Sequence, residues 1–138
     1  MTVQRTAVPA DAAQLSVLNQ FLREFWTAAA LAPAGMRPFE LVLEEIFMNI
    51  VMHGSQPGIA PQVEVSLTLA SDAVTMTVED DCPQFDPLSL PPPDLTEGLA
   101  ERPVGGLGVF LVRQMMDAVS YERVGMRNRL RMTRHLSS

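Results

Sequence analysis

Apolar residues recur at helical spacing in two stretches of the first half of the chain. Between Ala12 and Ala32 they fall three or four positions apart, which predicts one amphipathic helix with Pro9 and Asp11 as its stop and N-cap. A second helix is predicted from about Phe39 to His53, with Gly54 as its C-cap. We interpret three residues as the break between the two helices: Pro33, Gly35 and Pro38.

Alternation of apolar and polar residues with a period of two predicts strands. The clearest pair is Val63–Leu69 and Val74–Val78, which flank a turn at Ser71–Asp72 and predict an antiparallel hairpin with one face on a helical layer. We also predict an edge strand near the N-terminus and two closing strands joined by a turn at Gly125: Thr2–Val8, Val119–Val124 and Asn128–Leu136.

Residues 83–104 are different in kind, because they show little periodicity and contain six of the eleven prolines. A loop of this length inside a compact domain is usually functional, so we predict a lid there. Gly105–Gly108 ends the loop and opens a third helix that runs to about Met116. The order β-α-α-β-β-loop-α-β-β predicts an α+β fold in a single domain over residues 1–138: a two-layer sandwich, with a mostly antiparallel sheet covered on one face by about three helices.

Composition and charge exclude several classes of function. The chain is 47% hydrophobic and 19% charged, which is typical of a globular protein. Its 16 acidic and 10 basic residues leave a net charge of −6, so we expect no nucleic-acid binding. All ten basic residues are arginine, which excludes a lysine-dependent phosphate loop and Schiff-base chemistry. The single cysteine, Cys82, excludes an internal disulfide and a cysteine-based zinc cluster.

The sequence contains no pattern typical of export or of membrane insertion. The N-terminus lacks a charged, apolar, small-residue leader, so we expect no signal peptide. The longest nearly apolar stretch, Phe25–Ala34, is too short to span a bilayer. We therefore expect a soluble cytoplasmic protein that does not bind a membrane, in keeping with its lone thiol.

Two groups of polar residues are candidates for chemistry. Glu45 and Asn49 lie four positions apart and so share one face of the second predicted helix, close to His53. Glutamate can act as a base, and the carbonyl oxygen of asparagine suits a hard cation such as Mg²⁺; the alternative is a solvated helical stripe. Three acids that follow the hairpin are expected at a rim, where one could accept a hydrogen bond from a base amino group, or could simply keep a strand edge soluble: Glu79, Asp80 and Asp81.

Two further groups could bind anions. The glycines at 105, 106 and 108 would let the backbone approach a ligand, and exposed amides at a helix start attract phosphate, although glycine precedes helices in loops of every function. Arg102 is the nearest cation and could reach a terminal phosphate. Five late arginines indicate either an acidic partner or a solvated sheet edge: Arg123, Arg127, Arg129, Arg131 and Arg134.

In this order, the groups make the sequence similar to the histidine-kinase-like ATPases (the GHKL, or Bergerat-fold, superfamily). Within it the chain resembles the small anti-sigma-factor serine kinases of bacterial stress and sporulation control. The resemblance covers about Thr2 to Leu136. It is most specific in Glu44-Glu45-Ile46-Phe47-Met48-Asn49-Ile50-Val51-Met52-His53-Gly54, which resembles the N box of the family, in Gly105-Gly106-Leu107-Gly108-Val109-Phe110-Leu111-Val112, and in Phe85-Asp86-Pro87, which resembles the start of its lid.

The resemblance implies ATP and Mg²⁺ as cofactors. It implies that Asn49 holds Mg²⁺, that Glu45 is the general base, and that Asp80 accepts a hydrogen bond from the adenine amino group. It places Gly106 and Gly108 against the phosphates of the nucleotide, and Arg102 near the terminal phosphate. Relatives often support the adenine site with a threonine on a late strand; Asn128 roughly occupies that place and Thr133 lies further on, so neither is assigned the role.

One departure from the family pattern concerns the segment after Asp80. The first glycine box of the family reads Asp-x-Gly, whereas this chain has Asp80-Asp81-Cys82. We expect the added Cβ and sulfur to narrow the pocket or to strain the backbone, by about 1–3 kcal/mol.

The resemblance implies an ATP-binding anti-sigma regulatory factor with serine/threonine kinase activity. Its substrate would be an anti-anti-sigma-type protein, and it would hold a sigma factor when unopposed and form a homodimer. The alternative is a non-catalytic protein-binding module that keeps the ATPase fold but binds nucleotide weakly or not at all, an idea that rests on Cys82.

Overall fold

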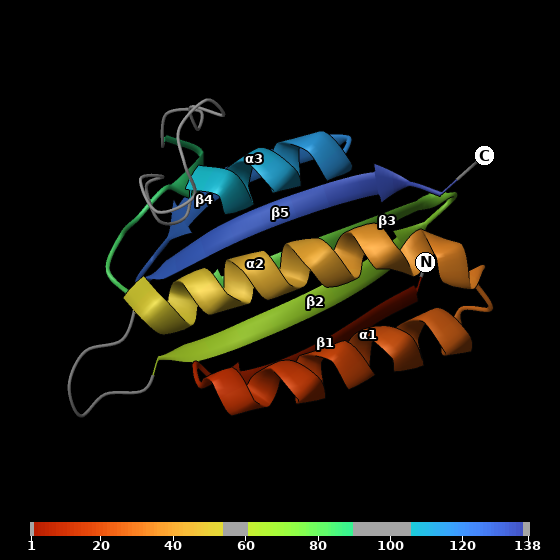
Figure 1. Ribbon diagram of the computed structural model, residues 1–138, viewed down its shortest axis with the longest axis horizontal. Helices are drawn as coiled ribbons and strands as arrows, with labels where there is room; N and C mark the ends of the chain where they lie inside the picture. The colour runs from red at the N-terminus through yellow and green to blue at the C-terminus, as the bar shows by residue number, and fades with distance from the viewer. Residues whose placement is uncertain (1, 54–60, 90–105, 137–138) are drawn as a thin grey trace.

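The computed structural model describes residues 2–53, 61–89 and 106–136. These residues form one antiparallel sheet with the strand order β1-β2-β3-β5-β4 and, in the same ranges, three α-helices (Figure 1). The strands are β1 (Thr2–Pro9), β2 (Gln62–Ala70), β3 (Ala73–Asp80), β4 (Ala118–Val124) and β5 (Arg127–His135). The helices are α1 (Leu15–Ala28), α2 (Arg37–His53) and α3 (Gly106–Met115), with short 3₁₀ turns η1 (Ala12–Gln14), η2 (Pro33–Met36) and η3 (Pro87–Ser89).

The helices cover one face of the sheet, which confirms the predicted two-layer α+β sandwich. Burial alternates along β3, where Val74, Met76 and Val78 are buried and the intervening residues are partly exposed. Buried residues from all three helices belong to one core together with these strand residues. Because successive side chains of a strand point to opposite faces, the alternation places the helical layer on one side only.

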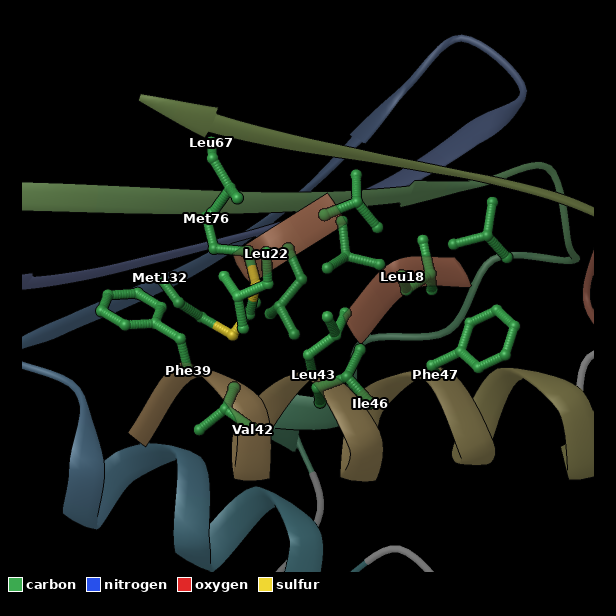
Figure 2. Close-up of a cluster of buried hydrophobic side chains, with 14 of the residues drawn as sticks. Leu18, Leu22, Phe39, Val42, Leu43, Ile46, Phe47, Leu67, Met76 and Met132 are labelled. Carbon is green, nitrogen blue, oxygen red and sulfur yellow. The ribbon is translucent and has the colours of Figure 1, made fainter. Parts of the chain in front are cut away.

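The core is formed by large aliphatic and aromatic side chains between the two layers (Figure 2). Phe39, Leu43 and Phe47 point from α2 toward the sheet, and all three are fully buried. They meet side chains from α1 and from three strands, also fully buried: Leu18, Leu22, Leu67, Met76 and Met132. At about 25 cal/mol per Å² of apolar surface, this burial supplies most of the favourable free energy of folding.

The connection between α1 and α2 differs from the prediction. The first helix ends at Ala28 and not at Ala32, because Ala30 adopts a left-handed conformation with φ 55°. The indole Nε1 of Trp26 donates to the carbonyl oxygen of Ala32 at 2.9 Å and holds this connection against the helix. The interpretation of Pro38 as a helix breaker was wrong. Pro38 is the second residue of α2, where a backbone N–H has no helical partner to lose.

The face of the sheet opposite the helices carries ion pairs in place of apolar residues. Arg129 bonds to Glu79 on β3 and, at 2.9 Å, to Glu122 on β4, and Arg127 lies 3.5 Å from Glu79. Part of the late arginine set therefore decorates a solvated sheet face. Arg123 and Arg134 lie on the opposite face, where Arg134 donates to the carbonyl oxygen of Met115 at 2.5 Å, at the C-terminal end of α3.

No helix among the described residues is both long enough and apolar enough to cross a membrane.

Candidate functional site

Glu45 and Asn49 of α2 lie directly opposite Gly108 of α3. A Cβ built on Gly108 would stand 3.1 Å from Oε2 of Glu45 and 3.4 Å from Nδ2 of Asn49. Glycine therefore lets the backbone of α3 come up to both polar side chains. Each side chain is partly exposed, and neither has a hydrogen-bond partner among the described residues. The arrangement leaves a carboxylate and an amide free to meet a ligand.

The sequences of the two helices explain this close contact. Val42, Ile46 and Phe47 of α2 are buried against the sheet, which leaves Glu45 and Asn49 at the side of the helix. On α3 the side chains of Val109 and Val112 are buried, and this orientation places Gly108 at the contact between α2 and α3. The helix begins at Gly106, and the N–H groups of its first turn have no intrahelical acceptor. Such a helix start attracts anions.

Asp80 ends β3 on the face of the sheet that the helices cover, and it is only 7% exposed. Its Oδ1 accepts two hydrogen bonds, from the backbone N–H of Cys82 at 3.0 Å and from Nδ2 of Asn128 at 2.9 Å. No N–H group of the described residues donates to its Oδ2, and the carboxylate also accepts a hydrogen bond from the thiol of Cys82. A nearly buried carboxylate with an unused acceptor can recognise an amino group.

The three consecutive acids have separate roles. Glu79 points to the open face of the sheet and pairs with Arg129, whereas Asp81 accepts a hydrogen bond from the backbone N–H of Gln62 at 2.9 Å. Only Asp80 of the three faces the helical layer, and it is buried, so the simple interpretation of an acidic turn that keeps the strand edge soluble does not apply to Asp80. The alternation of the strand separates neighbouring charges.

Cys82 fits its position without backbone strain, so this part of the expectation was wrong. Among the non-glycine residues that the structure describes, only Ala30 and Ser71 have positive φ. The N–H of Cys82 bonds to the side chain of Asp80 two residues earlier, a turn that an L-residue can adopt. Burial, and then the negative charge of Asp80, raises the pKa of the Cys82 thiol to about 12.

Asn128 on β5, to which the sequence analysis assigned no role, is the centre of a hydrogen-bond network. It lies opposite Asp80 in the strand register and is 7% exposed. Its Oδ1 accepts hydrogen bonds from the N–H of Phe85 at 3.1 Å, the hydroxyl of Tyr121 at 2.6 Å and Nη1 of Arg123 at 3.2 Å. Its burial could have been predicted from the sequence, because Asn128 lies two and four positions before Leu130 and Met132, which are buried on the same side of the strand.

Asn128 and Arg123 also hold the segment that follows Asp80. Nδ2 of Asn128 donates to the carbonyl oxygens of Pro83 at 3.0 Å and of Cys82 at 3.5 Å. Arg123 donates to the same carbonyl of Cys82 at 2.9 Å. The turn at 82–85 is therefore fixed by side chains from β4 and β5.

The candidate residues come from elements that end or begin at one end of the molecule. The C-terminal end of α2, the start of α3 and the end of β3 all lie at the left of Figure 1. Arg102, and residues 90–104 of the predicted lid, lie outside the described residues, so both stay predictions.

The described side chains offer few ligands to a metal ion. No group of three or more histidine, cysteine, aspartate or glutamate residues in these ranges could hold a metal ion. The carbonyl oxygen of Asn49, which has no competing partner there, is the kind of hard oxygen ligand that Mg²⁺ accepts. These residues fit an ion that takes most of its ligands from nucleotide phosphates and water.

The sequence pattern of the histidine kinase-like ATPase domain family matches residues 8–134. The chain belongs to this family. This histidine kinase-like ATPase domain is 31% identical over 116 residues to the serine/threonine-protein kinase BtrW of Bordetella bronchiseptica, an alignment that covers 83% of this chain and 77% of that protein.

Solved structures share the fold of this ATPase domain. The structure of the RsbU and RsbW domains of a Mycobacterium tuberculosis protein matches 100% of the chain with a TM-score of 0.71 at 15% identity, and the match spans 33% of that longer chain. The histidine kinase domain of a blue-light-activated kinase from Erythrobacter litoralis matches 94% of the chain and 62% of its own, with a TM-score of 0.56 at 17% identity.

Proposed function

We propose that this protein is an ATP-binding anti-sigma regulatory factor that phosphorylates a serine or threonine of an anti-anti-sigma-type protein. The observation that carries the proposal is the meeting of Glu45, Asn49 and Gly108 between α2 and α3, with Asp80 at the same end of the molecule. The chain is 31% identical to a serine/threonine-protein kinase in an alignment that covers 83% of its length. Among ATPase domains of this family, this similarity favours kinase activity.

Each residue has a role that suits its position. Asp80 accepts a hydrogen bond from the adenine amino group through Oδ2, the oxygen to which no N–H group of the described residues donates. Gly108 and the N–H groups at the start of α3 lie against the phosphates. Asn49 would hold Mg²⁺, which neutralises phosphate charge when it is bound.

Glu45 is the general base of the proposed reaction. Its carboxylate takes the proton from the hydroxyl of the acceptor as the hydroxyl oxygen forms a bond to the γ-phosphorus and the bond from that phosphorus to the β–γ bridging oxygen breaks. The products are the phosphorylated acceptor, ADP and a protonated Glu45. Because the side chain is partly exposed and unpaired within the described residues, it can reach an incoming hydroxyl.

The proposed partners follow from the family resemblance and from the names of the relatives. An anti-anti-sigma-type protein is the phosphate acceptor, and a sigma factor is held when that protein is absent. A homodimer and a cytoplasmic location complete the proposal. The proposal includes no nucleic-acid partner, an expectation that rests on the net charge of −6.

The first test is isothermal titration with ATP and ADP, with and without Mg²⁺. Micromolar, magnesium-dependent binding supports the proposal. A ligand at 100 times its Kd adds about 2.7 kcal/mol of stability, so the melting temperature must also rise when nucleotide is added. If no heat and no melting shift occur at millimolar nucleotide, the proposal fails and the chain is a non-catalytic binding module.

The second test separates the base from the binding site. Glu45→Ala abolishes phosphotransfer from labelled ATP to anti-anti-sigma proteins of the same genome but leaves ATP affinity within a few fold. Glu44→Ala is the matched control, since Glu44 is the neighbouring, exposed glutamate of the same helix. Retained phosphotransfer in the Glu45 variant would overturn the assigned base.

A further inference from the structure

The free edge of β1, together with the side of α1 next to it, forms a surface that the proposed function does not use. β1 is the last strand on one side of the sheet, and it pairs with β2 alone. We propose that this edge binds an extended segment of a partner protein, which adds to the sheet as a further strand and carries an acidic side chain opposite Arg5. The proposal does not rest on nucleotide binding, so the two can fail separately.

The backbone of β1 offers the main-chain groups that such a segment needs. The strand has eight residues, all in register with β2. In an antiparallel edge strand, every second residue turns its N–H and C=O groups away from its only neighbour. Between Thr2 and Val8, no described residue outside β2 bonds to these backbone groups, and only the carbonyl of Pro9 is bonded locally, by the N–H of Asp11. An extended peptide can pair with such a row of groups by strand addition.

The outer side of α1 supplies apolar side chains beside this edge. α1 contacts β1 and β2 as well as α2, and it lies with β1 at the lower edge of Figure 1. Trp26 marks the side of α1 that faces α2, because its ring packs on Phe39 with centroids 5.4 Å apart. With 3.6 residues per turn, Val17 and Phe21 fall on the other side of the buried Leu18, away from α2. Val17 is 46% exposed and Phe21 is partly exposed, so both are open to an added strand.

An added strand would have different surroundings on its two faces. Successive side chains of a strand alternate, so every second one would point to the helical side, where Val17 and Phe21 lie. The others would point to the open face of the sheet, opposite the helices, where β1 exposes Val3, Arg5 and Ala7. The segment that fits therefore alternates apolar residues, directed toward α1, with polar residues on the open face.

Arg5 determines the charge that this segment should carry. It is the only charged residue of β1, it is exposed, and it forms no ion pair or hydrogen bond with the described residues. The single acid of β2, Glu64, lies opposite Ala7 and is 4.0 Å from Arg127. Opposite charges on neighbouring strands attract each other, and like charges repel. An acidic side chain is thus favoured at the position opposite Arg5.

The same arginine disfavours a second copy of this chain as the occupant. If β1 of a copy paired antiparallel near full overlap, with both helical layers on one face, the two Arg5 side chains would lie opposite or diagonal to each other. Like charges in these positions are destabilising. The other edge strand, β4, is no better suited, because Glu122 on its open face already bonds to Arg129 at 2.9 Å. An acidic segment of a different protein has neither problem.

The test uses a fluorescently labelled, end-capped seven-residue peptide that alternates valine with polar residues: threonine, a central glutamate and threonine. A matched peptide has lysine in place of the glutamate. Binding is measured by anisotropy with the full chain, at low ionic strength and without nucleotide. The wild type should bind the glutamate peptide at least about threefold more tightly than the lysine peptide, because attraction in one complex and repulsion in the other add.

Three variants separate the contributions. Arg5→Glu should reverse the preference, so that the lysine peptide binds more tightly. Arg131→Glu is the matched control and must keep the wild-type preference, since Arg131 is also exposed on the open face but lies on β5, with β3 and β2 between it and β1. Val17→Ser should weaken both peptides about threefold and leave their ratio unchanged, because it removes apolar contact and no charge.

The outcomes decide the inference in either direction. Reversal of the preference by Arg5→Glu alone, with weakening of both peptides by Val17→Ser, supports it. Equal binding of the two peptides by the wild type would overturn it, and so would no binding of either peptide at millimolar concentration or an unchanged affinity in the Val17 variant. None of these results bears on the nucleotide site.

A second measurement locates the peptide on the wild-type protein and needs no variant. In the free protein, hydrogen exchange should be slow at every second amide of β1, those bonded to β2, and the glutamate peptide should protect the others. Protection of β4 in place of β1 would overturn the inference. So would full protection of β1 in peptide-free protein that sediments as a dimer, because a second copy would then occupy the edge.

Discussion

Gly108→Ala should separate the stability of the protein from its ability to bind nucleotide. The new Cβ would stand 3.1 Å from Oε2 of Glu45. Non-bonded heavy atoms prefer about 3.5–4.0 Å, so the carboxylate must move by roughly 0.4 Å or more. It can do so cheaply, because Oε2 is the end of a flexible, partly exposed side chain. The same methyl group fills the space where the phosphates are expected.

The expected magnitudes follow from these contacts. Replacing a helical glycine by alanine favours folding by about 0.5–1 kcal/mol, which offsets the crowding. Gly108 does not have positive φ, so alanine fits the backbone. The unliganded Tm should therefore change by no more than about 3 °C for a domain of this size. Displacing one charge-assisted contact to the ligand costs about 1.5 kcal/mol, which is about tenfold in Kd.

The assay is thermal melting with and without saturating Mg-ATP. The stabilisation by ligand should shrink by about 1.4 kcal/mol for a tenfold weaker Kd. Gly35→Ala is the control, since its new Cβ would make only ordinary contacts, at 3.4 Å to Leu136 and 3.5 Å to Trp26. An unchanged ligand shift in the Gly108 variant would show that this glycine does not border the nucleotide. A large loss of unliganded Tm would show that the contact with Glu45 cannot relax.

Three other changes have defined outcomes. Hydrogen bonds from His135 hold the pKa of Asp117 below its ordinary 3.8, so Asp117→Asn should lower the Tm at pH 7. In calorimetry, the difference in Tm between wild type and variant should vanish as the pH falls through that lowered pKa. A difference in Tm that is unchanged at pH 2 would contradict the stabilising role of the charged carboxylate. Because the pKa of the Cys82 thiol is raised to about 12, its reaction with a disulfide reagent at pH 8 should be at least about 100-fold slower in the native protein than in guanidinium, and rapid native labelling would refute this. Trp26→Phe leaves the carbonyl of Ala32 without its donor and should cost about 1–2 kcal/mol in urea denaturation followed by circular dichroism, whereas a loss below a few tenths would mean that water replaces the indole.

Periodicity was enough to find the elements but not all their ends. Strand alternation placed Val63–Leu69 and Val74–Val78 within one or two residues of β2 and β3, because every second side chain must be apolar when one face packs on helices. The end of α1 was missed because the alanine-rich segment 28–32 fits a helix as well as a turn. The helix is ended by the left-handed conformation of Ala30 and by the hydrogen bond from the indole of Trp26 to Ala32. Both are seen only in the three-dimensional structure.

The candidate site divides in the same way. The spacing of Glu45 and Asn49 is local, so the sequence could place them on one helix face. Their approach to Gly108 depends on how α3 packs against α2, which no local pattern encodes. The contact between Asn128 and Asp80 is harder still to predict from the sequence. The two residues are 48 positions apart, and only the register of β3 and β5 brings them together. Polar residues that act through pairing across strands are found only once the strands are paired.

The position of β5 in the sheet has a consequence for the order in which the molecule is completed on the ribosome. This strand is synthesised after all the others, yet it lies between β3 and β4. Without β5, the strands β1, β2 and β3 could still pair as they do in the sheet, but one edge of β3 would have no partner and β4 would have no neighbour. The amide that orients Asp80 would also be absent. Completion of the sheet and of the hydrogen-bond network around Asp80 therefore both depend on β5.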